Sequence, residues 1–187
     1  MSASASSASA PTLPSATDAG PLPVPRVYLA IGGNVEPERQ LLHAAAQLRR
    51  RFPGIHFSPC YQNPAFGFEG ADFYNVAAGF ESDATALAIV AQLHEIESLC
   101  GRRRDDPKWA PRAMDIDLLL YGATIADTAT YRLPRPDLLR HSYMLKPLAD
   151  IAPGLQHPIT GRTMADHWQE LEREPHALRQ LSLDLNG

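Results

Sequence analysis

The chain has 187 residues, a formal net charge of −4 and two cysteines. This length suits one domain whose core needs no disulfide or metal for stability, and Cys60 and Cys100 are too few for a disulfide framework. The acidic balance argues against a nucleic-acid-binding protein, whose affinity would come from a basic surface. No apolar run approaches the roughly 18 residues that a membrane helix needs, so we expect no membrane partner.

The first 25 residues consist almost entirely of Ser, Ala, Pro, Thr and Gly. Such a composition offers little apolar area to offset the entropy of ordering the segment, so residues 1–25 are predicted to be a disordered tail. Residues 26–187 are predicted to form a single domain. The N-terminus has neither the basic patch nor the apolar stretch of a secretory signal, and we therefore expect a cytoplasmic protein with reduced thiols.

The first predicted elements are a strand and a helix. The strand begins at Arg26 and ends at Gly32 and Gly33. The helix is predicted from Pro37, which suits a first turn, to the basic residues that end at Arg51. Its apolar positions recur at helical spacing and are Leu41, Leu42, Ala45, Leu48 and Phe52.

Strands are predicted next near 54–61 and at 73–81, followed by a helix that Asp83 is expected to cap and Gly101 to end. A buried strand is predicted from Met114 to Gly122 because the apolar content and the length of this segment suit one. The order βαββαβ predicts an α+β fold with a ferredoxin-like core and an antiparallel-rich sheet packed by helices. Additional C-terminal helices are expected near 142–151 and 164–173.

The densest chemical signal lies between Gly101 and Asp117, where five cationic side chains precede two carboxylates. The two-residue period of a strand places Asp115 and Asp117 on one face, with Cα atoms about 6.5 Å apart, while Ile116 points to the other face. Two carboxylates on one face suit Mg²⁺, which takes its remaining ligands from water and substrate phosphates. Arginines nearby suit the neutralisation of phosphate oxygens.

The alternative is that both acids line the solvated face of a strand and the arginines belong to a solvated loop. The apolar remainder of the strand and the closeness of the cations favour a site over this alternative. The chain has no G-x-x-x-x-G-K-[ST] sequence, which argues against a P-loop kinase.

These residues belong to an ordered set of motifs that resembles the 6-hydroxymethyl-7,8-dihydropterin pyrophosphokinases over roughly residues 27–163. The matching pieces in chain order are Ala30-Ile-Gly-Gly-Asn34, Tyr61-Gln-Asn-Pro64, Asp72-Phe-Tyr-Asn75, Glu97 with Gly101-Arg102-x-Arg104, Trp109-x-Pro-Arg112-x-x-Asp115-x-Asp117, and Leu145-x-Pro-Leu-x-x-Ile-Ala-Pro153. The segment from Trp109 to Asp117 is the most specific of them.

The resemblance implies transfer of pyrophosphate from ATP to the hydroxymethyl group of the pterin in folate biosynthesis, with attack at the β-phosphorus and release of AMP. It implies two Mg²⁺ ions bound by Asp115 and Asp117. The residues implied in catalysis are Arg102, Arg104, Trp109 and Arg112, and the loop that carries Arg104 and Trp109 is expected to close over the substrates. The residues implied in ATP binding are Glu97, Arg102, Arg104, Arg112, Arg135 and His141.

The resemblance also implies a pterin site in which Phe73 and Tyr143 stack on the ring and Asn75 reads its polar edge. Ordinary core packing is the alternative for the two aromatic residues. The other residues implied in substrate binding are Asn63, Pro64, Phe66 and Trp109.

The chain departs from the family pattern at Arg135 and His141, where the family usually carries a histidine and an arginine respectively. Only arginine stays charged near neutrality, so the exchange bears on phosphate binding. The alternatives to the main function are a divergent paralogue that acts on another pterin alcohol and a non-catalytic pterin or nucleotide binder. We expect a monomer, with a weak homodimer as the alternative.

Overall fold

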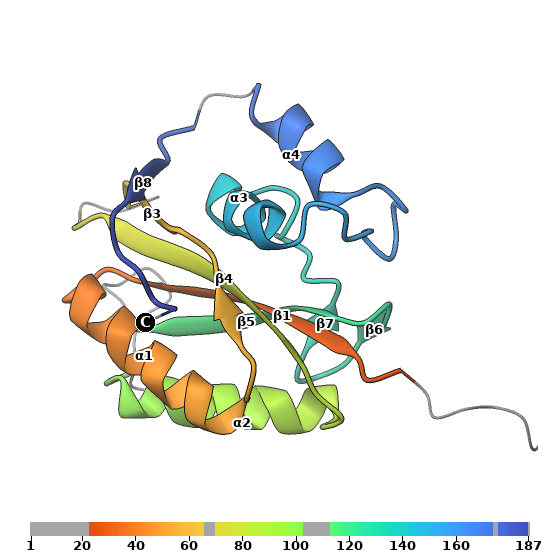
Figure 1. The fold of residues 1–187 in the computed structure, drawn as a ribbon, viewed down its shortest axis with the longest axis horizontal. Coiled ribbons are helices and arrows are strands. Elements are labelled where there is room, and N and C mark those ends of the chain that lie inside the picture. Colours follow the sequence, from red (N-terminus) through yellow and green to blue (C-terminus); the bar gives the residue numbers. More distant parts are fainter. Residues whose placement is uncertain (1–22, 66–69, 103–112, 174–175, 187) are drawn as a thin grey trace, which may run out of the picture.

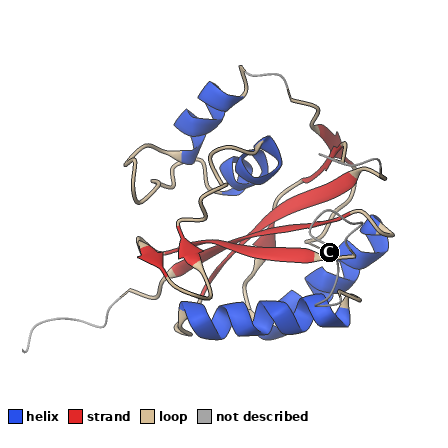
Figure 2. Ribbon diagram, turned by 180° about the vertical axis from the view of Figure 1, so that it is seen from behind, coloured by secondary structure: helices blue, strands red, loops and turns tan. Residues whose placement is uncertain are grey.

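The structure is a computed structural model that describes residues 23–65, 70–102, 113–173 and 176–186. Helices α1 (Pro37–Arg51) and α2 (Ala86–Leu99) cover one face of a central sheet (Figure 1). Helix α3 (Ser142–Ile151) lies on the other face, and α4 (Met164–Leu171) packs against α3. Figure 2 shows the same layers from behind, with the strands between the two groups of helices.

The sheet has the strand order β5-β1-β4-β3-β8, and β2 also pairs with β4. All of its described pairings are antiparallel. The strands are β1 (Arg26–Gly33), β2 (His56–Phe57), β3 (Cys60–Asn63), β4 (Phe73–Glu81), β5 (Asp115–Tyr121) and β8 (Arg179–Leu181). The predicted α+β class and βαββαβ core are confirmed, because α1 and α2 connect the core strands in that order.

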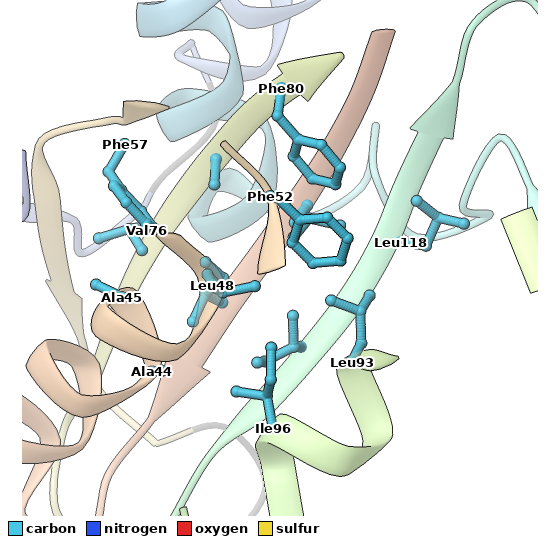
Figure 3. Packing of buried hydrophobic residues seen from close by; sticks show 14 of the residues in the cluster. Ala44, Ala45, Leu48, Phe52, Phe57, Val76, Phe80, Leu93, Ile96 and Leu118 are labelled. Atoms are coloured by element: carbon cyan, nitrogen blue, oxygen red, sulfur yellow. The ribbon is translucent and has the colours of Figure 1, made fainter. Parts of the chain in front are cut away.

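The layer between the sheet and helices α1 and α2 consists mainly of apolar side chains. Leu48 of α1 and Leu93 of α2 are almost completely buried, and they pack with strand residues such as Val76 (Figure 3). The rings of Phe52 and Phe80 stack with centroids 4.3 Å apart. Burial of side chains of this size stabilises the fold by roughly 1.5–3 kcal/mol each.

A second apolar layer joins α3 and α4 to the opposite face of the sheet. Leu145 and Leu148 of α3 are fully buried, and Trp168 of α4 belongs to the same cluster. The Tyr61 hydroxyl of β3 donates a hydrogen bond of 2.6 Å to Asp150 of α3. These contacts fix the position of α3 over the sheet, and with it the residues at the N-terminus of that helix.

Three local details differ from the sequence prediction. The strand expected near 54–61 is divided into β2 and β3 at Ser58 and Pro59, because proline has no N–H to donate to a ladder. The prediction that Asp83 caps α2 is wrong, since Thr85 is the N-cap and its hydroxyl accepts from the Ala88 N–H at 3.2 Å. Strand β8 and the hairpin of β6 (Ala126–Asp127) and β7 (Arg132–Leu133) were not predicted.

The predicted helices near 142–151 and 164–173 are confirmed as α3 and α4. Nearly all of the predicted tail, residues 1–22, lies outside the described residues. Within the described part of the chain, no helix combines the length and the apolar character needed to cross a bilayer.

Candidate active site

Among the described residues, several that the sequence singled out lie where four strands meet at one end of the sheet. Strands β1 and β3 end there, and β4 and β5 begin there, as the pairing of Gly32 with both Asn75 and Asp115 shows. Asn63 lies directly opposite Phe73 on the neighbouring pair of strands. Residues far apart in the sequence are therefore neighbours at this end.

The alternation of β5 separates its first residues between the two faces. Ile116 is buried in the cluster beneath α1 and α2, with 4% of its surface exposed. Asp115 and Asp117 lie on the opposite face, with side chains 28% and 20% exposed. The two carboxylates thus lie together on the α3 side, as the two-residue period of a strand requires.

An asparagine pair lies beside these carboxylates on the same face. The Asn75 amide is buried and donates a hydrogen bond of 2.5 Å to the Asn63 side-chain oxygen. A Cβ atom at Gly32 would lie 2.6 Å from Oδ1 of Asn75, which is closer than non-bonded atoms approach. The absence of a side chain at Gly32 therefore leaves space for the Asn75 amide. The sequence had indicated only that the strand ends at this pair of glycines.

A buried glutamate supports the start of β5 from behind. The Glu97 side chain is 4% exposed and accepts a hydrogen bond of 2.8 Å from the Ile116 N–H. It also pairs with Arg102, whose guanidinium lies 2.6 Å from Oδ1 of Asp115. Burial raises the pKa of Glu97 to about 7. Glu97 thus contacts the backbone between the two aspartates and the arginine beside them.

A second arginine reaches the carboxylates from the segment before α3. Nη1 of Arg135 lies 2.8 Å from Oδ1 of Asp117, and Nε lies 3.8 Å from Oδ2 of Asp137. The backbone N–H of Arg135 donates to the Leu119 carbonyl at 2.9 Å, which attaches this segment to β5. Asp137 had no distinguishing signal in the sequence.

The N-terminus of α3 brings two aromatic rings to this end of the molecule. His141 is the N-cap residue, and its ring stacks on Tyr143 with centroids 5.0 Å apart. Burial raises the pKa of Tyr143, and the nearby carboxylates of Asp137 and Asp117 raise it further.

The structure thus brings together most of the residues singled out by the sequence, from four strands and two helix termini. Pro64 is exposed at the end of β3, next to Asn63. Asn34, which is buried, had been noted only as part of a motif, and its side chain donates to the Ala71 carbonyl at 3.0 Å. Four of the expected site residues lie outside the described residues, namely Phe66, Arg104, Trp109 and Arg112.

The donor set at this end fits Mg²⁺. Asp115 and Asp117 supply two carboxylates on one face, and Mg²⁺ commonly combines one or two carboxylates with water and phosphate oxygens. In the described ranges, no group of three or more His, Cys, Asp or Glu side chains is placed to hold a metal.

Comparison with known proteins gives a consistent family. The family model described as 7,8-dihydro-6-hydroxymethylpterin-pyrophosphokinase (HPPK) matches residues 28–153. A 2-amino-4-hydroxy-6-hydroxymethyldihydropteridine pyrophosphokinase of Pseudomonas aeruginosa is 32% identical over 139 residues, covering 72% of this chain and 85% of that protein. The enzyme of that name from Methylorubrum extorquens is 32% identical over 152 residues, covering 79% and 94%.

A solved structure supports the same fold. Wild-type Plasmodium falciparum HPPK-DHPS with pteroate matches with a TM-score of 0.62 and 12% identity, covering 81% of this chain. The match covers 44% of that longer chain. At this identity the likeness concerns the fold alone.

Proposed function

This chain belongs to the 7,8-dihydro-6-hydroxymethylpterin-pyrophosphokinase family, and we propose that it transfers pyrophosphate from ATP to the hydroxymethyl group of 6-hydroxymethyl-7,8-dihydropterin. The chain is thus an ATP-dependent diphosphotransferase of folate biosynthesis. The observation that carries the proposal is the arrangement of Asp115 and Asp117 on one face, between Arg102 and Arg135 and beside the Asn75 amide.

In the reaction, the hydroxyl oxygen of the pterin attacks the β-phosphorus of ATP. A new O–P bond forms, the bond from the β-phosphorus to the oxygen that bridges to the α-phosphate breaks, and AMP leaves with that oxygen. The hydroxyl gives up its proton, so the products are AMP and the pterin pyrophosphate. The nucleophile belongs to the substrate, and the site residues act by binding and positioning.

Asp115 and Asp117 would hold Mg²⁺ at this site. The metal, when bound, neutralises phosphate oxygens and makes the substrate hydroxyl easier to deprotonate. Arg102 would contact phosphate from a position fixed by Glu97, because the buried carboxylate anchors its guanidinium. Arg104, Arg112 and Trp109 are proposed to complete the phosphate site and close it.

The pterin would lie against Phe73 and Tyr143, with its polar edge toward Asn75. The hydrogen bond from Asn75 to Asn63 fixes which way the Asn75 amide points, so its oxygen is turned toward Gly32. An amide oriented in this way offers a defined acceptor to a ring that carries N–H groups. Stacking supplies contact area, and the amide supplies selectivity. We also propose that the protein acts as a cytoplasmic monomer.

The proposal is tested by phosphorus NMR of the purified full-length protein with ATP, Mg²⁺ and 6-hydroxymethyl-7,8-dihydropterin. We expect AMP and a pterin pyrophosphate to appear together. Asp115→Ala should abolish both signals, whereas Asp127→Ala, which removes an exposed ion pair with Arg132, should not. Formation of ADP would mean transfer of a single phosphoryl group and would contradict the proposed reaction.

A second candidate is a paralogue that acts on another pterin alcohol. It is favoured by one observation, the ion pair of Arg135 with Asp117 at a position where the family usually carries histidine. The same NMR assay with other pterin alcohols separates the two functions. Binding of nucleotide and pterin without turnover of any alcohol would support a non-catalytic binder instead.

A further inference from the structure

The Arg135 side chain makes two ionic contacts at the site. Its guanidinium lies between Asp117, at 2.8 Å, and Asp137, at 3.8 Å. Its backbone is fixed separately by the hydrogen bond to the Leu119 carbonyl. The side chain, which is 36% exposed, is therefore able to leave Asp117 without any movement of the main chain.

Arg135 and a metal ion compete for the same carboxylate. Two cations beside one carboxylate repel each other strongly where both are partly shielded from water. Asp117 is 20% exposed, so screening by solvent at its side chain is incomplete. A metal at Asp117 therefore weakens the ion pair to Arg135, and that ion pair weakens binding of a metal that arrives alone.

We propose that Arg135 is a resident counter-ion of Asp117 and that, when the metal-nucleotide binds, the Arg135 guanidinium moves from this carboxylate to a phosphate group. The inference rests on the proposed function and assigns a specific task to one residue of that site. Asp137 keeps the released guanidinium near the site, because it contacts Nε while Asp117 contacts Nη1. Arg135 therefore weakens the binding of metal alone and strengthens the binding of metal together with nucleotide.

Arg102 is held by a more deeply buried carboxylate than Arg135, so Arg135 is the more mobile of the two residues. Arg102 is anchored by the Glu97 carboxylate, whose side chain is 4% exposed. The second anchor of Arg135 is Asp137, whose side chain is 43% exposed. A histidine at position 135 would carry a charge that depends on pH, whereas the charge of Arg135 is permanent.

The test measures binding of Mn²⁺, as a paramagnetic substitute for Mg²⁺, to the full-length protein by electron paramagnetic resonance. Each variant is measured with Mn²⁺ alone and with Mn²⁺ plus α,β-methylene ATP, in which the bond that the reaction breaks is blocked. The variants are Arg135→Gln, Arg135→Lys and the matched control Arg132→Gln, which removes the same charge from an exposed ion pair with Asp127.

For Arg135→Gln we expect Mn²⁺ alone to bind about fivefold more tightly, the scale of losing one partly exposed ion pair. We expect Mn²⁺ with the analogue to bind about tenfold more weakly, the scale of one charge-assisted bond to phosphate. Arg135→Lys should fall between wild type and Arg135→Gln in both measurements, and Arg132→Gln should match wild type. Circular dichroism confirms that each variant is folded.

Opposite changes in the two affinities are the expected signature, and no purely structural role produces them. A parallel loss, a parallel gain or no change in Arg135→Gln overturns the inference while leaving the proposed reaction intact. If Arg135→Gln does not fold, the same comparison is made with Arg135→Lys. Wild-type protein that binds no Mn²⁺ even with the analogue refutes the metal site itself, and with it this inference.

Discussion

The two faces of the central sheet differ at the strand ends that carry the site. On the α1 and α2 side, apolar packing continues to the start of β5, where Ile116 is buried. On the α3 side, the apolar cluster includes Leu119 and Leu120, and the residues before them on that face are Asp115 and Asp117. Neighbouring residues of β5 therefore alternate between the apolar core and the proposed metal site.

Asp117→Asn should have the largest effect of the substitutions, and this effect should be a loss of activity with little change in stability. The substitution keeps the shape of the side chain but removes the charge that a metal needs, so kcat/KM should fall by about 1,000-fold or more. The free energy of unfolding should change by less than about 1 kcal/mol, because Arg135 keeps its contact with Asp137. Steady-state kinetics and urea unfolding measure the two quantities.

Leu93→Ala should show the reverse pattern. Leu93 is 1% exposed in the layer beneath the sheet, and truncation of such a side chain costs about 3 kcal/mol of unfolding free energy. The activity of the protein that remains folded should stay within about twofold of wild type, since Leu93 is remote from the polar face. A large loss of turnover in folded Leu93→Ala would show that the two faces are not separable.

The sequence predicted the placement of Asp115 and Asp117 because strand alternation is a local rule. It also predicted both major helices and the core strands from apolar periodicity. It did not predict β8. This strand pairs with β3, where Cys60 lies opposite Leu181, and no local pattern specifies so distant a pairing. It likewise gave no sign of Asp137, which contacts Arg135 only because the chain folds.

For the candidate site, the sequence predicted which residues to consider but not which contacts they make. Glu97 was expected among the ATP ligands, and that role stays a prediction. The structure adds that its carboxylate is buried and accepts the Ile116 N–H, which depends on how α2 packs against β5. Propensity identifies the helix, but only the packing of two elements decides what a side chain on it reaches.

Gly32→Ala tests whether pterin binding depends on the orientation of the Asn75 amide beside Gly32. The added Cβ would meet Oδ1 of Asn75 at 2.6 Å, so the amide must turn away from its hydrogen bond with Asn63. We expect the KM for the pterin to rise about tenfold, the scale of one lost hydrogen bond, and the KM for ATP to change by less than about twofold. Gly154→Ala is the matched control, because nothing lies within 4 Å of its added Cβ. Equal rises in both KM values would mean that Asn75 does not read the pterin.

The smallest effect is expected in the loop between α3 and α4, where stability should depend on pH. Nδ1 of the buried His157 accepts from the backbone N–H groups of Ile159 and Thr160, each at 3.4 Å, and its ring meets His167 edge-on. Burial lowers the pKa of His157, and the neighbouring His167 lowers it further. The folded state thus binds this proton less tightly than the unfolded state.

The contribution of His157 is therefore present above the unfolded pKa of about 6.5 and is lost as the pH falls through that value. His157→Asn keeps an acceptor at the same place but does not titrate. We expect it to reduce the loss of unfolding free energy between about pH 7.5 and pH 5, measured by urea unfolding. His43→Asn, at an exposed position of α1, is the control and should leave the pH dependence unchanged. If the free energy of unfolding depends on pH in the same way for His157→Asn and wild type, protonation of His157 is not the cause of that dependence.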